Sequence, residues 1–544
     1  MFVRIKKSGT YQYLQIVENF REGNSVRQRV IGTLGRLEEL AGTRDIDSLI
    51  SKLSKYSKQV LMILCGESQI NAQAISVGPA LVFERLWNEL GISSIIKELS
   101  ADYKFTFPVE RAIFLTVLNR LFESGSDRKC EKWKTGVYVE GAEQLSLHHL
   151  YRAMNFLGRT TWDQRGKTPF ISRCNKDIIE EKLFQRRLDL FTSLDLVFFD
   201  TTSIYFEGNG GDEMGFRGHS KDSRPDLNQM VVGAVLNNDG EPICCELWPG
   251  NTTDVITLLP VTDRIRERFG VKNFCIVADR GMISSDTIKG LEQREMSYIL
   301  GARMRKQKII GQEVLTRGGR FAEVRNENNV DNHDPLKVKE VIACGKRYIV
   351  CMNDKQARKD AATRQAILET LEEKVKTDPK SLVGNKGFKK YLSIKKGSVT
   401  IDPKKIEADK RFDGKWVLQT NVSLPASDVA LKYKELWQVE QVFRDVKSIL
   451  ETRPIYHQTD ENIRGHVFCS FLALILKKEL DKRLSKISLD YEWNDITRDL
   501  LALQEVVIED GIKKVAIRTK CNGVSSGVFK AVGVAMPPSL KEIK

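Results

Sequence analysis

The sequence predicts an α/β protein, in which a sheet interleaved with helices follows a small β-unit and a long helical region. Two observations carry this prediction. The apolar periodicity changes from helical to strand-like near Asp195, and a strongly amphipathic helix follows residue 426. The 544 residues are enough for three or four domains. Hydrophobic residues make up 41% and charged residues 29%, which is ordinary for a folded globular chain.

The net charge of +14 indicates an affinity for polyanions, of which nucleic acid is the commonest. Solvated positive faces also occur on proteins that never bind DNA, so charge alone leaves both interpretations open. The ten cysteines include no Cys-x-x-Cys pair, which gives no support to a zinc site or a disulfide framework. No signal-like segment opens the chain, and its longest apolar stretch, Val467–Leu476, is far short of the ~20 residues of a membrane-spanning helix. We expect a soluble cytoplasmic protein with no membrane association.

The N-terminal third has two parts. Residues 1–36 alternate like short strands and carry seven basic and two acidic residues, which predicts a small basic β-unit. Residues 37–191 have helical periodicity with basic loops between short helices. This pattern suits a DNA-binding region, and it suits a helical scaffold equally well.

A central sheet is predicted from residue 192 onward. The apolar run Leu196–Phe199 is typical of a strand buried on both faces, and it ends at Asp200. Helices are expected near Asp254 and after Ser284. Strands are expected at 196–199, 230–236, 243–247, 274–277 and 298–300. Three antiparallel strands followed by helix, strand, helix and strand is the order of a ribonuclease-H-like core.

This core is expected to be discontinuous. Residues 304–412 combine short β runs with a charged helix, and they are too long for a structureless loop, so we predict a β-rich insertion domain. The core would thus consist of residues 192–303 and 413–480, the second part containing a strong helix from Ala426 to Leu450. Residues 481–544 form a C-terminal region that is a candidate for dimerisation.

Three carboxylates are the candidate catalytic residues. Asp200 and Asp279 each end a predicted buried strand, where open α/β sheets present functional groups, and Glu440 borders the apolar face of the helix. One narrow stripe of that helix carries Tyr433, Leu436, Glu440 and Lys447. Taken singly, the aspartates fit turn or cap residues and the helix fits an ordinary amphipathic helix. Together, three carboxylates suit two divalent metal ions about 3.5–4 Å apart, which is the arrangement used for phosphodiester chemistry.

The helix stripe resembles a known signature. The spacing of Tyr433, Glu440 and Lys447 is similar to the Tyr-Arg-Glu-Lys signature of DDE transposases from bacterial insertion sequences, with Leu436 at the arginine position. The segments around Asp200 and Asp279 resemble the two aspartate motifs of the same branch. Further similar segments are 218–226, 249–254 and 453–466, so the resemblance covers roughly residues 195–480. The long gap before the glutamate resembles the β-rich insertion of this branch.

The resemblance implies a function. Asp200, Asp279 and Glu440 would bind two Mg²⁺ or Mn²⁺ ions, and Tyr433 and Lys447 would contact phosphates of the transposon end. The substrate would be double-stranded DNA, both the terminal inverted repeats and the target. A homodimer in the synaptic complex and a cytoplasmic, nucleoid-associated location would follow.

Other candidates for DNA contact are cations near the carboxylates. Because leucine cannot hold a phosphate, Arg444, one helical turn after Glu440, is the candidate to replace the missing arginine. Lys221 and Arg224 lie in a polar loop where DNA contact and local hydrogen bonding are both open. We expect structural roles for Trp248, Trp416, His457 and His466.

Two alternatives to a transposase are open from the residues. One is another ribonuclease-H-like nuclease, such as a junction resolvase, although such nucleases are usually compact and this chain has a long insertion. The other is a catalytically silent DNA-binding protein of transposase descent, although all three carboxylates are present.

Overall fold

The computed structural model describes residues 2–22, 25–42, 71–164, 172–187, 194–324, 335–377, 382, 386–395, 398–509 and 514–543. The chain forms two compact units. The smaller unit comprises residues 1–74, 505–519 and 538–544, and the larger comprises residues 75–504 and 520–537. Among the described helices, none combines the length and apolar character needed to cross a membrane.

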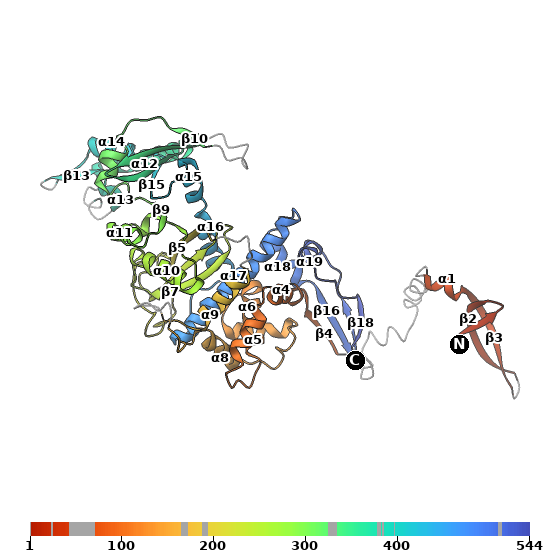
Figure 1. The fold of residues 1–544 in the computed structure, drawn as a ribbon. Helices are drawn as coiled ribbons and strands as arrows, with labels where there is room; N and C mark the ends of the chain where they lie inside the picture. The colour runs from red at the N-terminus through yellow and green to blue at the C-terminus, as the bar shows by residue number, and fades with distance from the viewer. Residues whose placement is uncertain are drawn as a thin grey trace. The chain divides into compact units, whose positions relative to one another are not determined.

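The larger unit is built on a nine-stranded mixed sheet (Figure 1). Its strand order is β10-β11-β12-β15-β9-β8-β5-β6-β7. The strands are β5 (Leu196–Tyr205), β6 (Gln229–Leu236), β7 (Pro242–Pro249), β8 (Cys275–Ala278), β9 (Ser297–Gly301), β10 (Ala322–Val324), β11 (Leu336–Ala343), β12 (Lys346–Met352) and β15 (Lys415–Thr420). The neighbours β5, β8 and β9 run parallel, and the remaining pairs are antiparallel. The fold is therefore a mixed α/β architecture around one large mixed sheet.

Helices cover the two faces of this sheet. Phe199 belongs to a cluster with residues of α10 (Asp254–Phe269) and α11 (Ser285–Gln293), which connect β7 to β8 and β8 to β9. Its neighbour Phe198 belongs to a different cluster, because successive side chains of a strand point to opposite faces. That second cluster includes apolar residues of α16 (Trp437–Arg444) and α17 (Asp460–Lys486). The first four residues of β5, Leu196–Phe199, are buried on both faces, which explains why this part of the strand is an unbroken apolar run.

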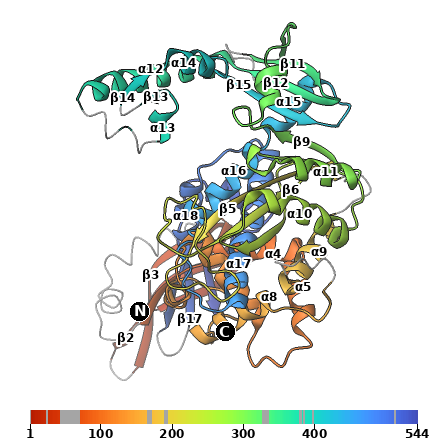
Figure 2. The same ribbon diagram turned by 90° about the vertical axis from the view of Figure 1, so that its left-hand side faces the viewer.

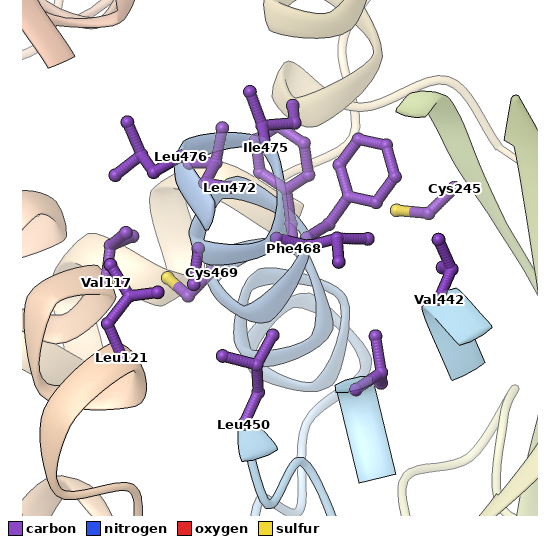
Figure 3. Close-up of a cluster of buried hydrophobic side chains, with 14 of the residues drawn as sticks. Val117, Leu121, Cys245, Val442, Leu450, Phe468, Cys469, Leu472, Ile475 and Leu476 are labelled. Carbon is purple, nitrogen blue, oxygen red and sulfur yellow. The ribbon is translucent and has the colours of Figure 1, made fainter. Parts of the chain in front are cut away.

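Helix α17 is the centre of the helical layer. It is buried almost continuously from Ile463 to Lys477 and packs against α6 and α8 (Figure 1, Figure 2). Figure 3 shows its side chains Phe468 and Leu472 between β7 and α16 on one side and α6 on the other. The surrounding helices are α4 (Gly78–Glu89), α5 (Ile92–Ser100), α6 (Val109–Phe122), α7 (Asp127–Trp133), α8 (Leu147–Gly158), α9 (Asn175–Arg187), α18 (Trp493–Leu501) and α19 (Ser525–Val532). Much of the predicted helical region thus has a packing role around a C-terminal helix.

A neutral network of buried charges joins α9, β7 and α10. Arg268, whose side chain is fully buried, lies 2.8 Å from Glu246 Oε1, 3.0 Å from Glu181 Oε1 and 3.2 Å from Asp177 Oδ1. The four cations are Arg173, Lys176, Arg264 and Arg268, and the four carboxylates are Asp177, Glu180, Glu181 and Glu246. Charges buried this deeply need such pairing, because desolvation of each ion costs several kcal/mol.

Two expected boundaries differ in the structure. Residues 304–412, which were expected to form a separate insertion domain, instead contribute β10, β11 and β12 to the core sheet. This is possible because β15 pairs with β9 on one edge and with β12 on the other. The same segment contains a 24-residue helix, α12 (Asp354–Thr377), together with α13 (Lys386–Lys389), α14 (Pro403–Lys410) and the hairpin β13 (Leu392–Lys395) and β14 (Ser398–Ile401). Within the region expected to be helical, residues 71–76 form strand β4.

The smaller unit contains two sheets. Strands β1 (Phe2–Ser8), β2 (Tyr11–Glu22) and β3 (Ser25–Arg36) form one, and helix α1 (Leu37–Gly42) follows them. The turn between β1 and β2 falls at Gly9 and Thr10. The other sheet has the order β18-β17-β16-β4 and comprises β4 (Asn71–Ser76), β16 (Gln504–Glu509), β17 (Lys514–Arg518) and β18 (Leu540–Ile543). The C-terminal strands thus find a partner more than 400 positions earlier in the chain, which local periodicity does not indicate.

Candidate active site

Two of the predicted carboxylates lie on neighbouring parallel strands. Phe199 of β5 pairs with Ala278 of β8, so the next residues, Asp200 and Asp279, lie at the same edge of the sheet. Asp200 accepts a hydrogen bond from its neighbour, the backbone N–H of Thr201, at 2.7 Å. The pKa of the Asp200 carboxyl is raised from 3.8 to about 6, mainly by burial. The nearby Asp279 and Asp254 carboxylates contribute to this rise, whereas Lys221 and the Thr201 N–H oppose it. These acidic groups are close enough to repel one another.

A cleft of about 960 Å³ opens beside this edge, and its lining includes Asp279, Glu440 and Asp254, together with Thr202 and Ser203 of β5. Glu440 is exposed on α16, at the border between the cleft and the buried residues of that helix. The structure therefore brings all three predicted carboxylates to one region.

Tyr433 contacts one of these carboxylates. Its hydroxyl donates a hydrogen bond to Asp279 Oδ1 at 3.1 Å. Burial raises the pKa of the phenol well above its usual range, and the adjacent Asp279 carboxylate raises it further, so the group stays a hydrogen-bond donor. The fit is tight, because a Cβ at Gly301 would lie 2.3 Å from the Tyr433 hydroxyl oxygen. In this structure, then, Tyr433 orients a carboxylate, whereas the resemblance implied a phosphate contact.

Lys221 and Asp254 complete the inner part of the site. Lys221 Nζ donates to the Thr201 carbonyl at 2.7 Å and lies 3.2 Å from Asp254 Oδ2. The Thr201 hydroxyl donates to Asp254 Oδ1 at 2.7 Å. Asp254 was not among the predicted site residues, although it ends the segment 249–254 that resembles the family.

Lys447 holds a loop rather than lining the cleft. Its Nζ lies 2.7 Å from Asp222 Oδ1, and Arg453 pairs with the same carboxylate. The Asp222 side chain is only 4% exposed. Burial lowers the pKa of the Lys447 ammonium, and Asp222 opposes this effect. Because Asp222 directly follows Lys221, the ion pair fixes the loop that carries Lys221 into the site.

The predicted single helix 426–450 is interrupted twice, which explains where Lys447 lies. Helix α15 (Ala426–Lys434) ends before α16 begins at Trp437, and the Leu436 N–H bonds to the Tyr433 carbonyl in a tightened turn. After Arg444 the turn widens, and the Leu450 N–H bonds to the Asp445 carbonyl five residues earlier. Such a π-turn inserts a residue and moves later side chains out of the regular stripe.

The other predicted DNA contacts have different surroundings. Arg224 is exposed and pairs with Asp226 at 2.8 Å. Arg444 is exposed on α16 and does not occur among the described residues that line the cleft. Trp248 is buried, as expected, and Trp416 is partly buried on β15 with its side chain at the cleft. His466 is buried and contacts the Thr452 carbonyl at 3.1 Å, as expected of a structural residue.

The cleft carries more positive than negative charge. Its cationic lining residues are Lys221, Arg280, Arg303, Arg305, Lys306, Lys415 and Lys434, against the carboxylates Asp254, Asp279 and Glu440. Sequence reasoning missed most of these cations. A signal was present in the basic run Arg303–Lys308 immediately after β9. A positively lined cleft around acidic residues suits a polyanion whose reacting group needs metal ions.

The chemistry of the site suits divalent cations. Its donors are hard carboxylate oxygens, and the mutual repulsion around Asp200 is what a divalent cation would relieve. In the part of the chain that the structure describes, no three acidic, histidine or cysteine side chains already converge at metal-binding distance. Asp200 and Asp279 share a sheet edge, whereas Glu440 is exposed on helix α16.

The comparisons place this site in a family. The chain belongs to the transposases with a DDE domain, since residues 192–476, just over half of its length, match the transposase DDE domain. Residues 3–67 match the N-terminal domain of the IS1634 family of transposases. The sequence-based prediction of a DDE transposase from a bacterial insertion sequence is thereby confirmed, and a junction resolvase is disfavoured. The protein is a DDE-type DNA transposase, an enzyme class that uses divalent metal ions.

Other comparisons add little. No curated protein matches the chain. Among solved structures, a piggyBac transposase in a synaptic complex with hairpin DNA is similar at 12% identity, with a TM-score of 0.35, over 78% of this chain and 79% of that one. That likeness is too slight for any property of that protein to be carried over.

Proposed function

We propose that this transposase cleaves and joins DNA at the ends of its insertion sequence with two Mg²⁺ or Mn²⁺ ions held by Asp200, Asp279 and Glu440. The observation that carries the proposal is the placement of Asp200 and Asp279 side by side on parallel strands, next to a positively lined cleft that Glu440 also lines. When bound, the ions would activate the attacking oxygen and stabilise the leaving oxygen.

The surrounding residues have supporting roles in this proposal. Tyr433 holds Asp279 in one orientation through its hydroxyl. Lys221 and the Thr201 hydroxyl fix Asp254 beside the reacting carboxylates. The cations of the cleft wall neutralise phosphates on both sides of the scissile bond.

The core itself is proposed to be ribonuclease-H-like. Three antiparallel strands, β5 to β7, are followed by α10, β8, α11 and β9, and β8 and β9 join the sheet on the other side of β5. This order and the parallel β5-β8-β9 arrangement support the assignment. The remaining strands of the nine extend that core at its β9 edge.

Recognition and assembly are also part of the proposal. The basic residues 1–36 and the helical region 37–191 would bind the element ends, although the packing of the described helices around α17 gives the helical region a scaffold role as well. Because two DNA ends must be joined, we propose a homodimer in the synaptic complex, with residues 481–544 as the candidate for the dimer contact.

The test is cleavage of a linear DNA that carries the element ends, with Mg²⁺ or Mn²⁺ added. Asp200→Asn, Asp279→Asn and Glu440→Gln should each abolish cleavage and leave end binding within a few-fold of the parent. Asp286→Asn, which removes an exposed carboxylate of α11, is the matched control and should cleave normally. Normal cleavage by any one of the first three variants would exclude that residue from the site.

A further inference from the structure

The three-stranded sheet β1–β3 has two chemically different faces. Paired residues point to the same side of a sheet, so the pairs Arg4–Gln15, Gln15–Thr33 and Asn19–Gln28 define one face, called here the amide face. Its described side chains are Phe2, Arg4, Lys6, Ser8, Tyr11, Tyr13, Gln15, Val17, Asn19, Arg21, Val26, Gln28, Val30, Thr33 and Arg36. This set holds four cations, three amides and no carboxylate.

The opposite face of the sheet differs in its charges and in the helix that packs against it. It presents the ion pair between Arg29 and Glu18, whose atoms lie 2.9 Å apart. It also presents Gly35, where a Cβ would lie 3.3 Å from the side chain of Leu40 in α1. Helix α1 therefore packs on the opposite face, although its Glu39 reaches Arg36 at the end of the amide face, where the two side chains lie 3.3 Å apart.

Hydrogen bonds across all three strands order the amide face. The Arg4 guanidinium donates to Gln28 Oε1 at 2.9 Å and to Gln15 Oε1 at 3.4 Å. The Gln15 amide donates in turn to the Thr33 hydroxyl at 3.1 Å. Arg4 thereby crosses over Val17, which is fully buried. The side-chain amides are held in place before any ligand binds.

We infer that the amide face enters the major groove of the element-end DNA and reads its sequence. Three strands about 4.8 Å apart have a width close to the ~12 Å of the major groove. Arginine, asparagine and glutamine are the side chains that pair with the edges of guanine and adenine, and the exposed Val26 and Val30 suit thymine methyl groups. Lys6 and Arg21, exposed at the two ends of the face, are placed to contact phosphates.

The charge of the face selects DNA over a second copy of the same sheet. Arg36 pairs with Glu39 of α1, whereas Arg4, Lys6 and Arg21 would repel an identical face and complement a phosphate backbone. This inference rests on the proposed function only in that the chain acts on DNA at element ends. It assigns recognition to a surface that contains none of the catalytic carboxylates.

The test compares matched substitutions on the two faces in the full chain. Lys6→Ala and Lys7→Ala change neighbouring exposed lysines on opposite faces. Gln28→Ala and Gln12→Ala change one amide on each face, the first exposed and the second partly buried. Binding to element-end DNA and to scrambled DNA of equal length is measured over a range of salt concentrations. Circular dichroism melting checks that each variant is folded.

The amide-face variants should stand apart from their controls. Lys6→Ala should weaken binding to both DNAs and lower the salt slope by about one. Gln28→Ala should reduce the preference for element ends by about ten-fold, as expected for a lost base contact. Lys7→Ala and Gln12→Ala should bind like the parent. Equal effects on the two faces, an unchanged preference in Gln28→Ala, or no preference in the parent would each overturn the inference.

Cleavage separates this inference from the proposed function. At saturating DNA, Gln28→Ala should cut element ends like the parent, whereas Asp200→Asn should keep the binding preference and lose cleavage. A parent protein that prefers element ends but does not cut them with metal would overturn the proposed function alone. A parent that cuts ends while Gln28→Ala keeps full preference would overturn the inference alone.

Discussion

Replacing Asp200 by asparagine should abolish cleavage and yet stabilise the metal-free protein. The carboxyl has its pKa raised from 3.8 to about 6 in the folded state, first by burial and then by neighbouring carboxylates. The folded protein therefore binds this proton more tightly than the unfolded chain does. Stability contributed by the protonated group is present at low pH and is lost as the pH rises toward and through 6. Above pH 6, this rise in pKa corresponds to a loss of about 3 kcal/mol in the free energy of unfolding.

The variant removes this cost, because asparagine cannot ionise. In metal-free buffer at about pH 7, Asp200→Asn should raise the free energy of unfolding by up to about 3 kcal/mol. The increase would be measured as a higher urea midpoint with an unchanged slope. Mn²⁺ should stabilise the parent, because an ion that binds only the folded state shifts the unfolding equilibrium, and it should have a smaller effect on the variant.

A control and two outcomes make this prediction decisive. Asp490→Asn, which removes an exposed carboxylate in a loop, should change neither stability nor metal response. If Asp200→Asn lowered the free energy of unfolding equally above and below the carboxyl pKa, the charge of Asp200 would not be what destabilises the metal-free protein. If Mn²⁺ stabilised the variant as much as the parent, Asp200 would not be a metal ligand.

Three further predictions follow from individual contacts. Gly301→Ala should displace the Tyr433 hydroxyl and lower cleavage at a stability cost of about 1–3 kcal/mol. The same change should cost less in a Tyr433→Phe background, where the hydroxyl is absent and the Arg280 backbone nitrogen, 2.9 Å from the added Cβ, is the closest remaining atom. Arg268→Met should lower the free energy of unfolding by about 3–5 kcal/mol in urea titrations, since it leaves buried carboxylates unpaired, and a neutral result would exclude a stabilising network. Lys447→Met should lower the free energy of unfolding by about 1–3 kcal/mol, and adding Asp222→Asn should recover most of this loss; no recovery would show that the ion pair with Asp222 is not its source.

Local patterns predicted the inner sheet well. The run from Leu196 to Phe199 is apolar throughout because β5 is buried on both faces, and the structure ends β8 directly before Asp279, as the sequence indicates. The five strands expected between residues 196 and 300 are all present. Each is determined by residues within a few positions of one another, which is the range over which strand periodicity acts.

The helix carrying Glu440 marks the limit of such reasoning. Its apolar stripe is continuous in sequence, and periodicity therefore predicted one helix through Leu450. The structure tightens the backbone near Leu436 and widens it after Arg444, so that Lys447 leaves the stripe and meets Asp222, 225 positions earlier. A hydrogen-bonding pattern that depends on packing against other elements has no local sequence signal.

By itself, the sequence determined the family, the α/β core, the strand end at Asp279 and the basic N-terminal strands, because short-range periodicity, charge and motif spacing are read along the chain. The strand expected to end at Asp200 instead continues to Tyr205, because β6 pairs with it along that stretch. Only the tertiary structure decided that Asp254 and Lys221 join the site, that Tyr433 holds Asp279, and that strands after residue 321 extend the same sheet. It also decided the neutral pairing of eight buried charges. The physical reason is common to all of these. These contacts are ion pairs, buried hydrogen bonds and strand pairings between segments that lie far apart in the sequence. The number of residues between two such segments does not indicate how close they lie in the folded chain.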